Sequence, residues 1–68
     1  PNVNKFEQIK YHYETLMKFF PEKAVVLSMR THLANYLKKE YKNTKLLIEL
    51  LKMNSYSEII EKLRQNML

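Results

Sequence analysis

The sequence predicts an all-α fold, a compact four-helix bundle that forms a single domain over residues 1–68. The chain has 68 residues, no glycine and only two prolines, so residues that favour hairpins and tight β-turns are scarce. Apolar residues recur at helical spacing in segments separated by short polar stretches. We therefore expect four helices, with links near residue 21, residues 42–44 and residues 54–55.

The first helix is expected to run from Asn4 to Phe20. Asn4 and Glu7 have the spacing of a capping box, in which two side chains satisfy backbone N–H groups at the start of a helix. Apolar residues then recur along one face, at Phe6, Ile9, Tyr13, Leu16, Met17 and Phe20. This spacing predicts an amphipathic helix with one buried face.

The second helix is expected to begin near Pro21 and to end at about Tyr41. Proline suits the first turn of a helix, and Glu22 adds a favourable negative charge there. On a helical wheel the buried stripe consists of Val25, Val26, Met29, Leu33, Tyr36 and Leu37. Arg30 and His32 fall on the two edges of this stripe. The polar face opposite it consists of Thr31, Asn35, Lys38 and Lys42.

Two polar stretches predict the starts of the last two helices. Asn43 or Thr44 is expected to cap a short third helix, and Ser55 with Glu58 forms a second capping box. The third helix is so rich in apolar residues that we expect it to be buried on several sides: Leu46, Leu47, Ile48, Leu50 and Leu51. The inward stripe of the fourth helix is expected to be Tyr56, Ile59, Ile60, Leu63 and Met67.

The charge balance favours a polyanionic partner. Twelve Lys and Arg residues face seven acidic ones, which gives a formal charge of +5, although lysine-rich composition alone can produce such a surface. Arg30 can clamp a phosphate with its planar guanidinium, or it can bond carbonyls of a neighbouring helix or pair with Glu14 or Glu49. His32 can donate to a phosphate or stack on a base, or it can have a structural role at the core edge.

Several chemistries are disfavoured by composition. Without cysteine the chain has no disulfide, no thiolate nucleophile and no cysteine-based zinc site, and it suits a reducing cytoplasm. His12 and Glu14 have the H-x-E spacing of zinc deaminases, but the cysteines that complete that site are missing. We expect no catalytic residue, metal or nucleotide site here. Neither a membrane span nor a signal peptide is expected. Tyr11 and Tyr41 are candidate platforms for base stacking.

Residues 12–38, HYETLMKFFPEKAVVLSMRTHLANYLK, place Arg30, His32, Tyr36 and Lys38 at a distinctive spacing. This stretch resembles the C-terminal helical domain of bacterial tRNA-dihydrouridine synthases. That domain has a histidine-led helix, an acidic turn, an R-K-H-x-x-x-Y-L-K-like segment and a final S-x-x-E helix, and the resemblance extends from about Asn4 to Leu63. The chain departs from the family pattern at three positions, with Thr31 in place of lysine, Lys39 in place of glycine and Leu47 in place of a basic residue.

The resemblance implies that this chain is the tRNA-binding part of a larger cytoplasmic flavoprotein oxidoreductase of tRNA processing. In that family a TIM barrel uses FMN and NADPH to reduce uridine in tRNA, and the helical domain holds the tRNA. The chain itself would then contain no cofactor and no catalytic residue, and its partners would be tRNA and the barrel of the same parent chain. The implied tRNA contacts are Arg30, His32, Asn35, Lys38, Lys39 and Lys42.

The alternative is a basic helical protein–protein interaction module that binds no nucleic acid. The two hypotheses differ in where the charges lie on the surface. One contiguous basic face favours tRNA, whereas scattered lysines around an exposed apolar patch favour a protein partner.

Overall fold

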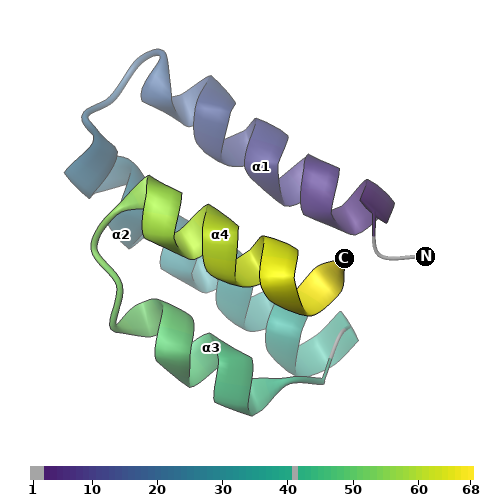
Figure 1. The fold of residues 1–68 in the computed structure, drawn as a ribbon. Helices are drawn as coiled ribbons and strands as arrows, with labels where there is room; N and C mark the ends of the chain where they lie inside the picture. The colour runs from purple at the N-terminus through teal and green to yellow at the C-terminus, as the bar shows by residue number, and fades with distance from the viewer. Residues whose placement is uncertain (1–2, 41) are drawn as a thin grey trace.

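A computed structural model describes the backbone of residues 3–40 and 42–68 and the side chains of residues 4–38 and 42–68. The predicted all-α four-helix bundle is confirmed (Figure 1). Its elements are α1 (Val3–Met17), α2 (Glu22–Asn35), a π-helical continuation of α2 called η1 (Tyr36–Glu40), α3 (Thr44–Leu51) and α4 (Tyr56–Met67). Figure 1 shows α1 beside α4, and α1 also packs against α2, which in turn contacts α3.

The core is formed by side chains from all four helices and from η1. Its buried residues are Phe6, Tyr13, Val25, Val26, Met29, Leu33, Leu37, Leu46, Leu47, Leu50, Ile59, Leu63 and Met67. Each of them belongs to a stripe that the apolar spacing predicts. Ile9, Leu16, Tyr36 and Ile60 are half-buried and pack against this core. The helical periodicity of the sequence therefore identifies the interior of the bundle.

The bounds of α1 correct two expectations. Asn4 lies inside the helix, which already includes Val3, so the prediction that Asn4 caps the helix together with Glu7 is wrong. In an α-helix the N–H of Glu7 faces the carbonyl of Val3 and needs no side-chain cap. The helix also ends at Met17 rather than at Phe20, which is 56% exposed. After Met17 the chain tightens into a turn, in which the N–H groups of Lys18 and Phe19 bond the carbonyls of Thr15 and Leu16, and Pro21 disfavours helical geometry at Phe20.

The second helix begins where proline predicts but changes its geometry before it ends. Pro21 occupies the N-cap position with φ −63° and ψ 152°, and α2 runs from Glu22. At η1 the turn widens to the π-helical form, in which each hydrogen bond spans one more residue than in an α-helix. The helical wheel still places Leu37 in the core and Lys38 in solvent, but it does not hold at Lys42, where the backbone is left-handed. Tyr41, the predicted end of this helix, lies outside the described residues.

Lys42 is the turning point between η1 and α3. Its φ of 57° is left-handed, and the N–H of Asn43 closes the turn on the carbonyl of Leu37 at 2.6 Å. This closure resembles a Schellman cap that has been widened by one residue to match the π turn. Lys42 therefore does not continue the polar helix face on which the sequence places it. The chain has no glycine to occupy this position.

Replacing the strained Lys42 is expected to stabilise the fold. A left-handed conformation costs an L-residue about 1–2 kcal/mol, and glycine avoids this cost but loses about 0.5–1 kcal/mol in chain entropy. Lys42→Gly should therefore raise the free energy of unfolding by about 0.5–1 kcal/mol. Urea denaturation measures the change. The control is Lys45→Gly in the first turn of α3, which should lower the same quantity, and a loss in both variants would contradict the prediction.

The caps of α3 and α4 are confirmed, but the burial of α3 is not. The side chain of Asn43 accepts from the N–H of Leu46 at 3.0 Å. Ser55 Oγ accepts from the N–H of Glu58 at 3.4 Å and donates to the Glu58 carboxylate at 3.0 Å. The expectation that α3 is buried on several sides is wrong, because Ile48 is 51% exposed. In this small bundle α3 has a solvent-facing side.

Candidate nucleic-acid interface

Three lysines gather where η1 ends and α3 begins. Lys38 lies on η1, Lys42 in the left-handed turn and Lys45 in the first turn of α3, and we call these three residues the lysine cluster. All three side chains are exposed. Since α3 packs against η1, the turn keeps the three residues at the same end of the bundle (Figure 1). In the part of the chain that the structure describes, no acidic side chain pairs with any of them.

A polar hollow extends from the lysine cluster to the C-terminal end of α4. Its lining residues are Asn43, Lys45, Leu46, Glu49, Lys62 and Asn66. The ammonium of Lys62 lies 3.3 Å from a carboxylate oxygen of Glu49, so this acidic side chain already has a cationic partner. Among the described residues, Lys45 is therefore the cation lining this hollow that has no acidic partner.

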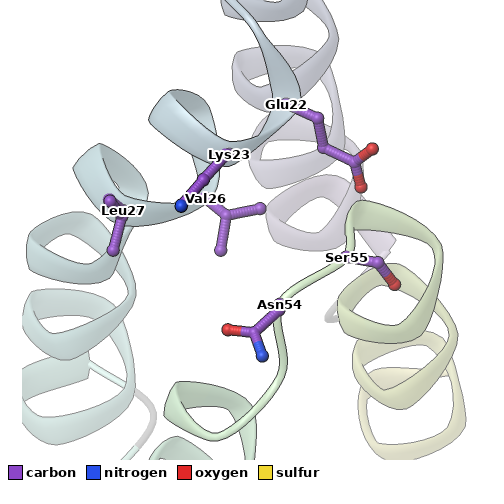
Figure 2. Close-up of a pocket in the computed structure, with 6 residues that line it drawn as sticks. All are labelled: Glu22, Lys23, Val26, Leu27, Asn54 and Ser55. Atoms are coloured by element: carbon purple, nitrogen blue, oxygen red, sulfur yellow. The ribbon is translucent and has the colours of Figure 1, made fainter.

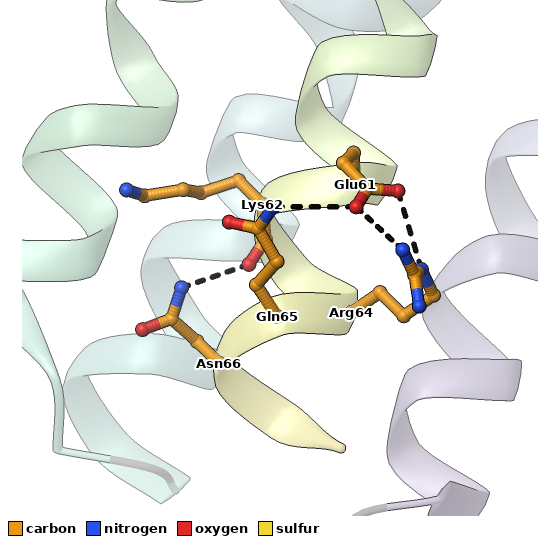
Figure 3. A network of polar contacts seen from close by, with 5 residues as sticks. All are labelled: Glu61, Lys62, Arg64, Gln65 and Asn66. Carbon is orange, nitrogen blue, oxygen red and sulfur yellow. Dashed lines mark hydrogen bonds and ion pairs between the residues drawn. The ribbon is translucent and has the colours of Figure 1, made fainter.

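Glu61, which precedes Lys62 in α4, also has hydrogen-bond partners on its own helix. Figure 3 shows Glu61 bound by Arg64 and Gln65, with Arg64 Nε and Gln65 Nε2 each 3.2 Å from a carboxylate oxygen. The hydrogen bond from Arg64 lowers the pKa of Glu61 below its ordinary value. In the same view Lys62 extends away from Glu61. Glu49, which lines the hollow, thus pairs with Lys62, while Glu61 pairs with Arg64 on another side of α4 (Figure 3).

Arg30 has a structural contact that separates it from the lysine cluster. It is half-buried, and its Nη2 donates to the carbonyl of Leu51 at 3.3 Å. Leu51 is the last residue of α3, where backbone carbonyls lack partners within the helix. The lysine cluster lies at the opposite end of α3. The sequence allowed a bond to the carbonyls of a neighbouring helix, and this is the contact observed.

The two carboxylates suggested as partners of Arg30 have other partners. Glu49 pairs with Lys62, and Glu14 accepts a hydrogen bond from Tyr56. The buried Nε of Arg30 has no hydrogen-bond partner among the described residues. Arg30 thus ties α2 to the end of α3.

Arg30→Met is expected to destabilise the fold. Methionine keeps most of the length of the side chain but removes a charged hydrogen bond, which contributes about 1.5–3 kcal/mol. We expect the free energy of unfolding, measured by urea denaturation, to fall by about 1–2 kcal/mol, because the bond is long and only part-buried. Lys52→Met is the matched control, since Lys52 is exposed. Equal effects of both substitutions would contradict the structural role of Arg30.

His32 is exposed and lies against a second histidine. Its ring is 4.6 Å from that of His12, centroid to centroid, at an interplanar angle of 67°. Imidazoles are common zinc ligands, but a structural zinc site needs four ligands. The described residues contain no group of three or more candidate ligands. We therefore assign no metal site to this pair, which links α1 to α2.

Asn35 and Lys39 are the remaining predicted contacts with tRNA. Asn35 is exposed at the last position of α2, directly before η1. Lys39 lies in η1, and its side chain is outside the described residues. Of the two candidate stacking platforms, Tyr11 is 70% exposed and Tyr41 is not described. The structure therefore brings Lys38, Lys42 and Asn35 to one end, and it adds Lys45, which the predicted set lacks.

Tyr56 joins three helices at the other end of the bundle. Its N–H donates to the Glu22 carboxylate at 2.6 Å, and its hydroxyl donates to the Glu14 carboxylate at 3.0 Å. Its ring lies 5.5 Å from the buried ring of Tyr13. Burial raises the pKa of both hydroxyls above the ordinary value, and the hydrogen bond to Glu14 raises that of Tyr56 further. The exposed carboxylates of Glu14 and Glu22 are thus held by hydrogen bonds to α4 at the surface of the fold.

No protein-family model, curated protein or solved structure matches this chain. The resemblance to the tRNA-dihydrouridine synthases therefore stays a hypothesis, carried by the spacing of Arg30, His32, Tyr36 and Lys38. Within the described residues, no helix has both the length and the apolarity that a membrane crossing requires.

Proposed function

We propose that this chain binds tRNA as the helical module of an FMN- and NADPH-dependent tRNA-dihydrouridine synthase, in the cytoplasm. The observation that supports binding of an RNA is the lysine cluster, in which Lys38, Lys42 and Lys45 are exposed where η1 is followed by α3. The carboxylate of Glu49, which lines the hollow beside the cluster, is paired with Lys62 of α4. A polyanion is the partner that such a cluster attracts.

The lysines act by position and charge. An ammonium group contacts phosphate as a point charge, so the cluster fixes the RNA backbone without reading its bases. The amide of Asn35, one residue before η1, adds a neutral donor and acceptor beside these charges. In this proposal the module holds the tRNA, while the TIM barrel of the parent chain binds FMN and NADPH and reduces uridine to dihydrouridine.

The test is a titration of the purified chain with fluorescently labelled tRNA at several salt concentrations. Each neutralised phosphate steepens the fall of log K with log salt by about 0.7–0.9, so three contacts predict a slope between about −2 and −3. Failure to bind at low salt, or binding that salt does not weaken, would contradict the proposal. The first outcome would favour the protein-interaction alternative.

A further inference from the structure

The polar hollow beside the lysine cluster contains a carboxylate as well as cations. It has a volume of about 280 Å³ and lies between the first two turns of α3 and the end of α4. Lys45 and Glu49 line it from α3, where they are one helical turn apart, and Lys62 lines it from α4. Figure 3 shows Lys62 and Asn66 on the same side of α4. The hollow therefore combines two ammonium groups with one carboxylate.

The carboxylate of Glu49 has acceptor capacity to spare. Its Oε1 lies 3.3 Å from the ammonium of Lys62, which is its only side-chain partner among the described residues. The side chain of Glu49 is 43% exposed, so a ligand in the hollow can reach it. An ionised carboxylate accepts several hydrogen bonds and donates none, whereas a lysine ammonium only donates. A ligand that complements the hollow therefore brings a donor for Glu49 and anionic oxygens for the two lysines.

A larger hollow near the other end of the bundle lacks this combination. It has a volume of about 560 Å³ and lies between α2 and the α3–α4 link (Figure 2). Lys23 is the one cation among its lining residues, and the carboxylate of Glu22 already accepts the N–H of Tyr56. Figure 2 shows the apolar side chains of Val26 and Leu27 on the α2 side. Of these two hollows, only the one beside the lysine cluster pairs two cations with a carboxylate.

We infer that this polar hollow binds the ribose–phosphate backbone of RNA and that Glu49 recognises a ribose 2′-hydroxyl, an inference that rests on the proposed binding of tRNA. The hydroxyl donates to the Glu49 carboxylate, while phosphates beside that ribose contact Lys45 and Lys62. The 2′-hydroxyl is the group by which a protein distinguishes RNA from DNA. The charge of Glu49 repels phosphates, and a hydroxyl that donates to it offsets this repulsion. Glu49 is therefore a specificity residue.

The probes are two labelled hairpins of the same sequence, one of RNA and one in which fluorine replaces every 2′-hydroxyl. The two hairpins carry the same phosphates, but fluorine cannot donate a hydrogen bond. From the usual contribution of a hydrogen bond, we expect the RNA hairpin to bind about five- to tenfold more tightly at the same salt concentration. Fluorescence anisotropy measures both affinities.

Two matched variants assign this preference to one residue. Glu49→Ala removes the acceptor and frees Lys62, and it should abolish the preference for the RNA hairpin. Glu61→Ala also removes a carboxylate and frees a cation, Arg64, but on another side of α4, so it should keep the preference. Both variants should keep the helical circular dichroism of the wild type, because alanine favours helices and ion pairs near the surface contribute little to stability.

Side-chain amide signals in NMR spectra locate the contact. Asn43 and Asn66 line the polar hollow, whereas Asn54 lines the hollow of Figure 2. We expect the RNA hairpin to shift the NH₂ signals of Asn43 and Asn66 and to leave those of Asn54 in place.

Four outcomes would overturn this inference while leaving tRNA binding intact. They are equal affinity of the wild type for the two hairpins, a preference that Glu49→Ala retains, loss of the preference in both variants, and no shifts at Asn43 and Asn66. Competition by adenosine monophosphate at the same concentration as the RNA hairpin would also overturn it and assign the hollow to a free nucleotide. Failure to bind either hairpin at low salt would overturn the tRNA proposal together with this inference.

Discussion

Leu63→Ala is expected to remove most of the stability of this domain. Leu63 is completely buried in α4, where it contributes to the core shared by the helices. Truncating a buried leucine to alanine costs about 2–5 kcal/mol, because apolar burial is lost and a cavity remains. A core of this size supplies only about 3–5 kcal/mol of net stability. We therefore expect a large fraction of the variant to be unfolded at room temperature, as measured by urea denaturation followed by circular dichroism.

Ile48→Ala is the matched control for this substitution. Ile48 is also an aliphatic residue within a helix, but its side chain is 51% exposed. Surface substitutions usually change the free energy of unfolding by no more than about 0.5 kcal/mol, and we expect this variant to stay close to that range. A loss at Ile48 as large as the loss at Leu63 would contradict the packing described here.

The second large effect is expected on tRNA binding. Replacing Lys38, Lys42 and Lys45 together by alanine should flatten the dependence of log K on log salt by about 2–3, because three phosphate contacts no longer release counterions. Affinity should fall most at low salt, where counterion release contributes most. Titration of wild type and variant with the same labelled tRNA measures both quantities, and thermal melts check that the helices remain folded.

A control triple variant separates local contacts from net charge. Lys10, Lys18 and Lys52 belong to α1, the turn after it and the end of α3, away from the lysine cluster. Their replacement by alanine changes the net charge by the same amount. We expect the control to keep a steeper salt dependence than the cluster variant. Equal flattening in both variants would show that tRNA responds only to overall charge and would remove the interface from the lysine cluster.

Much of the fold could be predicted from local sequence patterns. Apolar spacing predicted every buried core residue, since a side chain that recurs on one helix face has to pack on its neighbours. The caps at Asn43 and Ser55 were also predicted, because a cap is a contact between residues close in sequence. The end of α2 was not predicted. The change to π geometry at η1 accompanies the left-handed turn at Lys42 and the packing of η1 against α3, which are not local sequence patterns.

The candidate site was predictable only in part, because it depends on contacts between helices that are not adjacent residues in the sequence. A helical wheel placed Arg30 and His32 at the edges of a stripe, but it could not show which element faces each edge. Their observed neighbours, the Leu51 carbonyl and the His12 ring, come from other helices. Lys45 joins Lys38 and Lys42 only because the left-handed turn brings α3 back along η1.

The contacts of Tyr56 have a consequence for folding during synthesis. Most helix pairs here are neighbours in the chain, and contacts of this local kind let helical bundles fold in microseconds to milliseconds. Tyr56 instead links the last helix to Glu14 of the first and to Glu22 of the second. A growing chain can therefore pair α1 with α2 early, but the apolar faces of both stay partly uncovered until α4 has left the ribosome. During that interval the nascent helices are exposed to chaperones and to aggregation.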